Sequence, residues 1–354
     1  MSPASQENQP EPCDIAIIGM GCLFPKASDL GAYWENILNK INAITEVPED
    51  RWDWKKYYSQ DRYAKDRLYS KWGAFIDDIR FDPLSHGIPP KSLASIEPLQ
   101  LLALEVVNQA LEDADYKNRD FPRDRTSVIF GISGSGEHGQ KYCFRSSLPM
   151  FFGNFAEDIT AYHTDNLPQW TEDSFPGILT NVTAGRIANR FDLGGVNCTI
   201  DAACASSLSA LYMSVRELEA GTSDIVIVGG ADCTQNPFAY LCFSKTQALS
   251  PRGISAPFDD TADGIVLGEG LAAIILKRLS HARRDGDKIY AVIKGVGASS
   301  DGRDKSLTAP RREGQVKALQ RAYAQAGISP ETIGLIEAHA TGTAVGDRVE
   351  IESM

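Results

Sequence analysis

The amino-acid sequence predicts an α/β fold, in which buried strands alternate with amphipathic helices. Short continuous apolar runs bounded by glycine or polar residues are typical of strands that are buried on both faces. Such runs occur at residues 14–20, 126–132, 224–230 and 271–279. Residues 93–114 carry apolar side chains at helical spacing, which indicates a core helix between the first two runs.

A second series of the same elements begins near residue 291. Residues 291–298 and 333–338 are predicted strands, and residues 312–326 between them are a predicted helix. The repeated alternation of strand and helix predicts two similar α/β halves.

The segments between these elements are less regular. Helices are predicted over residues 30–39 and 175–191. Residues 47–81 are aromatic and charged without a clean period, which indicates a long excursion over the surface. This excursion is either a contact for a carrier or another subunit, or a satellite hydrophobic cluster. Residues 144–174 are aromatic and weakly periodic, and we expect them to line a substrate channel or a dimer surface.

Composition excludes several classes of function. The chain of 354 residues has 47 acidic and 35 basic side chains, a net charge of −12, which argues against nucleic-acid binding. It has no apolar run long enough to span a bilayer, so we expect no membrane association and a cytoplasmic location. Its seven cysteines lack CxxC spacing, which favours reduced thiols over a disulfide or metal framework.

Cys204 is the first candidate catalytic residue. It follows an apolar, β-capable stretch, is surrounded by small residues in DAACASS, and precedes a helical pattern that runs from Leu208 to Glu219. A thiol at the start of a helix lies at the positive end of the helix dipole, which favours the nucleophilic thiolate. The alternative is a cysteine that packs as a small hydrophobic side chain.

His339 is the second candidate. It follows the apolar run 333–336 and lies in EAHATGTAVGD, residues 337–347, a loop of hydroxyls and flexible backbone. An imidazole there could donate a hydrogen bond to a developing oxyanion or accept a proton. The alternative is a structural histidine at the end of a strand.

Three other motifs are weaker. GMGCLF lacks the third glycine of a dinucleotide fingerprint. The loop GISGSGEHG could bind phosphate, but a flexible loop beside an active site is favoured. The carboxylates at Asp259, Asp260, Asp263 and Glu269 could bind metal or act as acid and base.

The motifs together resemble those of the β-ketoacyl synthases, condensing enzymes of the thiolase-like superfamily. The resemblance rests on IAIIGMGCLFP at residues 15–25, DAACASS around Cys204, PFDDTADGIVLGEG at residues 257–270 and EAHATGT around His339. These motifs span nearly the whole chain in the family's order. The first motif and DRWDWKKYY are similar to those of multidomain synthases that make polyketides, polyunsaturated fatty acids or glycolipids.

The resemblance implies a thiolase-like fold and a set of roles. Cys204 would accept an acyl group, and His339 would stabilise the enolate formed from a malonyl unit. Thr341 and Thr343 would contact the phosphopantetheine arm of an acyl carrier protein, with no tightly bound cofactor and no metal. Glu269 would be an orienting group in a structural loop. A homodimer and neighbouring synthase domains would be the other partners.

The resemblance also implies how the chain divides. Residues 1–12 would be a disordered leader or linker, residues 13–290 the half that carries the nucleophile, and residues 291–354 the start of an incomplete second half. The family's lysine and second catalytic histidine would follow Met354, so we expect the chain alone to be aggregation-prone and a poor condensing enzyme.

Two alternatives stay open. One is a non-catalytic chain that binds a carrier protein or a synthase subunit. The other is a thiolase, which should use a further cysteine in its second half, and no cysteine follows Cys242.

Overall fold

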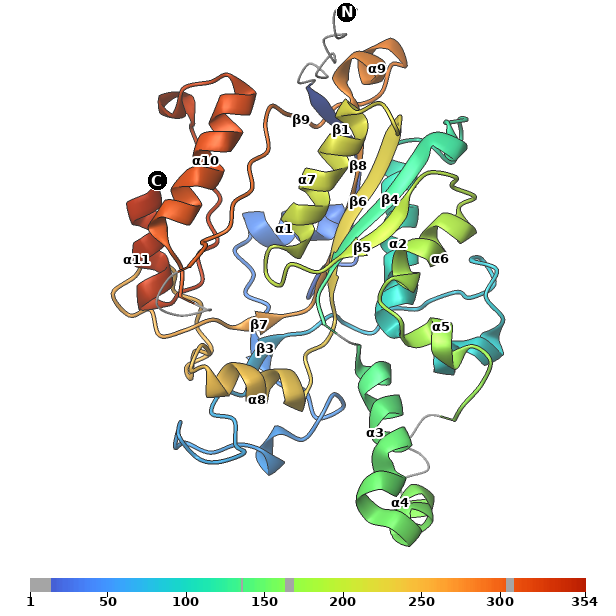
Figure 1. Cartoon of the computed structure of the whole chain (residues 1–354), viewed down its shortest axis with the longest axis vertical. Coiled ribbons are helices and arrows are strands. Elements are labelled where there is room, and N and C mark those ends of the chain that lie inside the picture. The colour runs from blue at the N-terminus through green and yellow to red at the C-terminus, as the bar shows by residue number, and fades with distance from the viewer. Residues whose placement is uncertain (1–13, 135, 163–168, 304–308) are drawn as a thin grey trace, which may run out of the picture.

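A six-stranded mixed sheet organises the computed structural model, which describes residues 14–134, 136–162, 169–303 and 309–354 (Figure 1). Strand β4 pairs in parallel with β5 and β6, and the other pairs are antiparallel. The buried strands predicted near residues 14, 126, 224 and 271 are confirmed. In spatial order the strands are β5 (Asn197–Ile200), β4 (Thr126–Ile132), β6 (Ile225–Asp232), β8 (Gly270–Arg278), β1 (Ile15–Leu23) and β9 (Ala291–Ile293).

Helices cover both faces of this sheet (Figure 1). Helix α7 (Ser206–Glu219) packs on one face, and α2 (Pro98–Asp113) and α6 (Val182–Arg190) pack on the other. Successive strand residues point to opposite faces, so Ile227 of β6 packs toward α2 while Val228 packs toward α7. The continuous apolar runs of the sequence follow from this burial on both faces.

Most of the segment 47–81 belongs to a satellite hydrophobic cluster, one of the two predicted alternatives, while Ile76, Ile79 and Phe81 at its end pack on the main core. The cluster lies beside a small sheet of β2 (Thr45–Glu46), β3 (Trp72–Ala74) and β7 (Leu267–Gly268), and beside α8 (Pro237–Lys245). The buried Tyr69 hydroxyl donates to the carbonyl of Leu249 at 3.0 Å. A contact with a carrier or another subunit stays a prediction for this segment.

Two predicted helices have different limits in the structure. The segment 93–114 is a 3-10 turn over Pro90–Ser95 followed by α2, which begins at Pro98 because proline suits the first position of a helix. The continuous helix predicted over 175–191 is wrong. The segment is two helices, α5 (Ser174–Ile178) and α6, because the buried Gln100 amide binds the carbonyls of Pro176, Gly177 and Leu179 at the break.

The aromatic segment 144–174 contains helices that extend away from the body of the molecule (Figure 1). They are α3 (Glu137–Phe152), a 3-10 turn (Gly153–Phe155) and α4 (Ala156–Tyr162), and part of this segment, 163–168, lies outside the described residues. The remaining helices of the first half are α1 (Leu30–Leu38), α9 (Leu279–Arg284) and the 3-10 turns Trp54–Lys56 and Arg123–Arg125. The helix predicted over 30–39 is confirmed by α1.

The second half is less regular than predicted. Helix α10 (Arg312–Ala326) is confirmed, and a 3-10 turn (Pro330–Thr332) and α11 (Ala344–Ser353) follow it. Strand β9 covers only residues 291–293 of the predicted 291–298. The strand predicted over 333–338 is wrong, because an extended segment becomes a strand only beside a pairing neighbour, and within the described residues 333–338 pair with no strand. Leu335 is 85% exposed.

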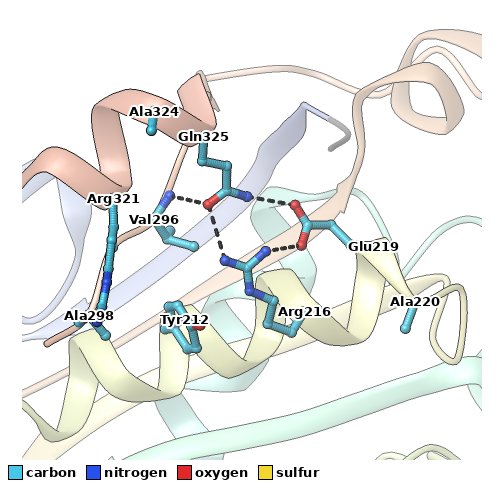
Figure 2. Close-up of a pocket in the computed structure, with 10 residues that line it drawn as sticks. Tyr212, Arg216, Glu219, Ala220, Val296, Ala298, Arg321, Ala324 and Gln325 are labelled. Carbon is cyan, nitrogen blue, oxygen red and sulfur yellow. Dashed lines mark hydrogen bonds and ion pairs between the residues drawn. The ribbon is translucent and has the colours of Figure 1, made fainter. Parts of the chain in front are cut away.

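Helix α10 attaches to α7 through a small polar network (Figure 2). The Gln325 amide donates to Glu219 at 2.7 Å, and its oxygen accepts from the backbone N–H of Val296 at 3.0 Å and from Arg216 at 3.3 Å. Arg216 also pairs with Glu219. These side chains lie at the edge of a hollow of about 720 Å³ between the two helices.

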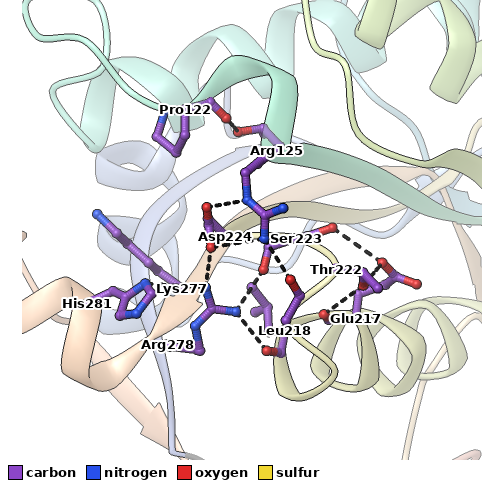
Figure 3. Close-up of polar contacts among 12 residues, drawn as sticks. Pro122, Arg125, Glu217, Leu218, Thr222, Ser223, Asp224, Lys277, Arg278 and His281 are labelled. Carbon is purple, nitrogen blue, oxygen red and sulfur yellow. Dashed lines mark hydrogen bonds and ion pairs between the residues drawn. The ribbon is translucent and has the colours of Figure 1, made fainter.

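A second polar network holds the end of the sheet where β4 and β6 begin (Figure 3). Asp224, which directly precedes β6, accepts from Arg125 at 2.6 Å and also pairs with Arg278. Arg278 donates to the carbonyls of Leu218 and Ser223, at 2.8 Å each. The Arg125 hydrogen bond holds the pKa of Asp224 below its ordinary value.

The described part of the chain contains no helix that is both long and apolar enough to cross a membrane.

Candidate active site

Cys204 lies in a tight turn between β5 and α7, as the sequence predicts. Ala203 has a φ of 50°, in the left-handed region that a residue with a Cβ rarely adopts. Ala205 is the N-cap residue of α7 and has no side-chain oxygen, so its side chain caps none of the free N–H groups of the first turn. The turn therefore presents the thiol beside uncapped amides at the positive end of a helix.

The Cys204 side chain is exposed, unlike those of several other cysteines. Burial raises the pKa of Cys22 to about 11, and it raises the pKa of Cys233 well above the ordinary value. These two thiols stay protonated and act as packing groups. Cys204 does not fit the alternative of a buried packing cysteine.

An open cavity of about 340 Å³ lies in front of the thiol. It is formed where the carboxyl ends of β4 and β6 meet the start of α7, the usual place for ligands in parallel α/β sheets. Its lining residues are Phe24, Gly131, Ser133, Ala203, Cys204, Ser206, Ser207, Gly230, Ala231, Asp232, Gly270 and Ala272.

Two glycines let α7 approach the sheet this closely. A Cβ on Gly131 would lie 2.3 Å from the backbone carbon of Ser206, and a Cβ on Gly230 would lie 2.7 Å from the Cβ of Ser207. Any larger residue would push the first turn of α7, and Cys204 with it, away from the ends of β4 and β6.

His339 lies in a loop whose backbone is hydrogen-bonded to the carboxylate of Glu350. The backbone N–H groups of His339 and Ala340 donate to the two oxygens of Glu350 on α11, at 2.6 and 2.9 Å. The His339 side chain is exposed, and it is not among the side chains that line the Cys204 cavity. The structure therefore shows each candidate in an accessible loop without a contact between them.

Thr341 and Thr343 are half-buried and close together, with their hydroxyl oxygens 2.9 Å apart. The Thr343 hydroxyl is also the N-cap of α11, where it accepts from the N–H of Gly346 at 3.2 Å. It therefore has a structural role in addition to any contact with a substrate.

Asp347, which our sequence analysis did not single out, joins two of the motifs. Its buried carboxylate accepts from the N–H of Gly342 at 3.0 Å and from the N–H of Phe258 at 2.7 Å. Gly264 donates to the carbonyl of Gly342 at 2.9 Å. The loop that carries His339 is thus bound to the PFDDTADG loop. Asp347 is the last residue of the motif EAHATGTAVGD, and that position is the only signal the sequence offers.

Glu269 is the buried member of the acidic loop. It accepts from the N–H of Ile76 at 2.8 Å and from Arg51 at 3.2 Å, and burial raises its pKa. Asp263 instead pairs with Arg252 at 2.7 Å. Both act as structural groups of the loop. Across the residues that the structure describes, no three His, Cys, Asp or Glu side chains gather in a way that could hold a metal ion.

Comparison with known protein families covers almost the whole chain. Residues 13–282 match the N-terminal domain of the β-ketoacyl synthases, and residues 290–354 match the C-terminal domain.

Relatives of known function are long synthases. The chain is 37% identical over 364 residues to a polyunsaturated fatty acid synthase subunit from a Thraustochytrium species, and it covers 13% of that protein. It is 36% identical over 355 residues to the polyketide synthase PksN of Bacillus subtilis and covers 6% of it. All of this chain is covered in both cases.

Solved structures agree with these relatives. The ketosynthase from module 6 of the bacillaene synthase of Bacillus subtilis superposes with a TM-score of 0.81 at 32% identity, over 96% of this chain and 53% of that one. A ketosynthase domain of the oxazolomycin synthase of Streptomyces albus gives 0.82 at 30% identity, over 96% and 55%. The chain spans about half the length of these ketosynthases and shares their thiolase-like fold. It belongs to the β-ketoacyl synthase family.

Proposed function

We propose that this chain is the part of a ketosynthase that carries the nucleophile, and that it acts as an acyltransferase in the elongation of polyketide-like or fatty-acid-like chains. The observation that carries the proposal is the position of Cys204, exposed in a cavity at the uncapped start of α7. A thiolate is suited to this chemistry because exchange of one thioester for another is nearly balanced in free energy.

The first step is acyl transfer. The Cys204 thiol loses its proton, and the thiolate attacks the carbonyl carbon of an acyl thioester. The bond from that carbon to the pantetheine sulfur breaks, and the departing pantetheine thiolate takes up the proton that Cys204 lost. The oxyanion that forms needs N–H donors, and we assign this role to the amide of Cys204, next to the uncapped start of α7.

The second step is decarboxylative Claisen condensation. A malonyl thioester loses CO₂, the enolate carbon attacks the acyl carbon on Cys204, and the thiolate of Cys204 leaves. The product is a β-ketoacyl thioester that is two carbons longer. We assign His339 as the donor to the enolate oxygen, and Thr341 and Thr343 as contacts for the phosphopantetheine arm. Support comes from the bonds that Glu350 and Asp347 make to this loop.

An acyl carrier protein and the neighbouring domains of a synthase are the partners we propose, in the cytoplasm. We also propose a homodimer. Strand β5 is an edge of the six-stranded sheet, and Val196 just before it is 52% exposed. The α3–α4 segment adds exposed apolar side chains, with Met150 83%, Phe151 77% and Phe155 71% exposed. An edge strand beside an apolar surface favours association with another polypeptide.

A non-catalytic role is the second candidate. The exposed His339 side chain, which does not line the Cys204 cavity, favours a chain that binds a carrier protein without completing condensation.

Two measurements separate the candidates. The purified chain is incubated with an acyl-pantetheine thioester, and the acylated peptide is identified by mass spectrometry. We expect acylation at Cys204, its loss in Cys204→Ser and its retention in Cys143→Ser, since Cys143 is exposed on α3. Acylation spread evenly over the exposed cysteines would contradict the proposal.

The acyl-enzyme is then given a malonyl-loaded carrier protein, and release of CO₂ and of β-ketoacyl product is measured. We expect this chain to catalyse condensation slowly, and we expect His339→Ala to lower the rate further. Acylation at Cys204 without any detectable β-ketoacyl product would favour the non-catalytic candidate.

A further inference from the structure

We infer that Asp201 and Ser206 are positioning residues that clamp the turn at Ala203 and thereby aim Cys204 into its cavity. The inference rests on the proposed function, because it assigns these residues a role in acyl transfer to Cys204. Neither residue needs to touch the substrate. Both act through the backbone of Ala202 and Ala203, the two residues that precede the nucleophile.

Ser206 holds the turn from the helix side. It is only 5% exposed, and its hydroxyl accepts from the N–H of Ala202 at 2.9 Å while donating to the carbonyl of Ala203 at 2.7 Å. The hydroxyl thus bridges the peptide group before Ala202 and the peptide group after Ala203. Ser206 is the first residue of α7, so these two bonds tie the start of the helix to the turn that precedes it.

Asp201 holds the turn from the strand side. One carboxylate oxygen accepts from the N–H of Ala203 at 3.0 Å, and the other accepts from the N–H of Gly134 at 3.1 Å. Gly134 lies in the loop after β4, so the carboxylate connects the nucleophile turn to the next strand of the sheet. These N–H donors hold the pKa of Asp201 below its ordinary value, so the carboxylate keeps both acceptors at neutral pH.

The need for a clamp comes from the backbone itself. Alanine with a φ of 50° is unfavourable, and such a conformation persists only where the surroundings over-determine it. Ala205 donates to the carbonyl of Ala202 at 3.1 Å, and Ser206 donates to that of Ala203 at 3.0 Å, which closes the turn. None of these bonds uses the N–H of Cys204. The clamp therefore fixes the thiol and leaves the adjacent amide free to face an oxyanion.

The test compares variants of the clamp with matched controls. Asp201→Asn replaces one acceptor oxygen with an NH2 group that cannot accept, Ser206→Ala removes the hydroxyl, and Ser206→Thr keeps it. Ser214→Ala is the control for Ser206, because Ser214 is buried on the same helix and donates to the carbonyl of Ala210 at 2.7 Å, away from the turn. Asp61→Asn is the control for Asp201, because Asp61 accepts from an N–H two residues later, at 2.9 Å, in an exposed loop.

Two rates are measured on each variant. The first is acylation of Cys204 by an acyl-pantetheine thioester, which needs the sulfur and the N–H donors to be correctly placed around the same carbonyl group. The second is alkylation of Cys204 by iodoacetamide, relative to that of Cys143, which needs an accessible thiolate but no donors for an oxyanion. Thermal unfolding reports whether each variant is folded.

We expect Ser206→Ala and Asp201→Asn to slow acylation by about tenfold or more, as small misplacements of reacting groups do. Alkylation of Cys204 should change much less, Ser206→Thr should recover acylation, and both controls should match the wild type. Wild-type acylation rates in folded Ser206→Ala and Asp201→Asn would overturn the clamp.

Failure of the proposed function is recognised separately. In that case the wild type itself shows no selective acylation of Cys204. Hydrogen–deuterium exchange of the backbone amides then tests whether Asp201 and Ser206 hold the turn. Faster exchange of the Ala202 amide in Ser206→Ala, and of the Ala203 and Gly134 amides in Asp201→Asn, would support it. Unchanged exchange at these amides would overturn it.

Discussion

The loop at Cys204 and the loop at His339 follow similar apolar stretches, but the two regions differ in how the structure supports them. The stretch before Cys204 is β5, which pairs with β4 and leads into α7 on a covered sheet. The stretch before His339, residues 333–338, is irregular, with Leu335 85% and Ile336 53% exposed. Hydrophobicity alone therefore does not make a strand, because the partner that pairs with it and covers it must also be present.

The largest difference should appear on truncating one apolar side chain in the core of the covered sheet and one in residues 333–338. Leu276 on β8 is fully buried between β6 and β1, so we expect Leu276→Ala to lower the free energy of unfolding by about 3 kcal/mol. Leu335→Ala should change it by less than about 0.5 kcal/mol, because the side chain is already in solvent. Urea denaturation followed by circular dichroism measures both.

A cost above about 2 kcal/mol for Leu335→Ala would break the comparison, because it would mean that residues 333–338 are packed in solution. A second readout sharpens the expected case. Binding of a hydrophobic dye should fall in Leu335→Ala, because the variant removes part of an exposed apolar surface.

A smaller difference in stability should appear between two Gly→Ala substitutions, one beside the Cys204 turn and one before His339. Gly131→Ala would place its Cβ 2.3 Å from the backbone of Ser206, so we expect a loss of about 2 kcal/mol together with slower acylation of Cys204. At Gly334 no atom beyond its two neighbours in the chain lies within 4 Å of an added Cβ, and Gly334→Ala should leave both quantities unchanged. Stability is measured by urea denaturation and acylation by mass spectrometry. A fully stable Gly131→Ala would show that α7 can move away from β4 at little cost.

The sequence is informative where structure depends on neighbours along the chain. Strand β4 and helix α10 have the predicted limits, and Cys204 lies at the predicted junction of strand, turn and helix. The contact of Asp201 with the N–H two residues later is also local, so an aspartate before a tight turn is a signal that sequence analysis could use.

The errors occur where structure depends on residues far away in the chain. The helix predicted over 175–191 breaks where the side-chain amide of Gln100, on α2, donates to three backbone carbonyls of the segment. No pattern within the segment itself contains that information. Residues 333–338 begin with the continuous apolar run of a buried strand, but burial depends on a partner. The role of Asp347 likewise depends on the distant residue Phe258.

The smallest effect we predict is a pH dependence that belongs to the sheet and not to the second half. Two arginines stabilise the ionised form of Asp224, and its pKa lies below the ordinary value of 3.8. A carboxyl group with a lowered pKa in the folded state stabilises the protein above its unfolded pKa, and the contribution is lost as pH falls through the folded pKa.

We expect Asp224→Asn to cost about 1 kcal/mol near pH 7, since solvent screens the half-exposed Arg125. The cost should shrink below pH 3.8 as the wild-type carboxyl becomes protonated. Glu331→Gln, which also removes one carboxylate but at an exposed position before residues 333–338, is the control. Urea denaturation across this pH range measures the free energy of unfolding of each variant. A cost for Asp224→Asn that stays constant through the acid range would contradict the prediction, because the arginines would then bind the side chain without depending on its charge.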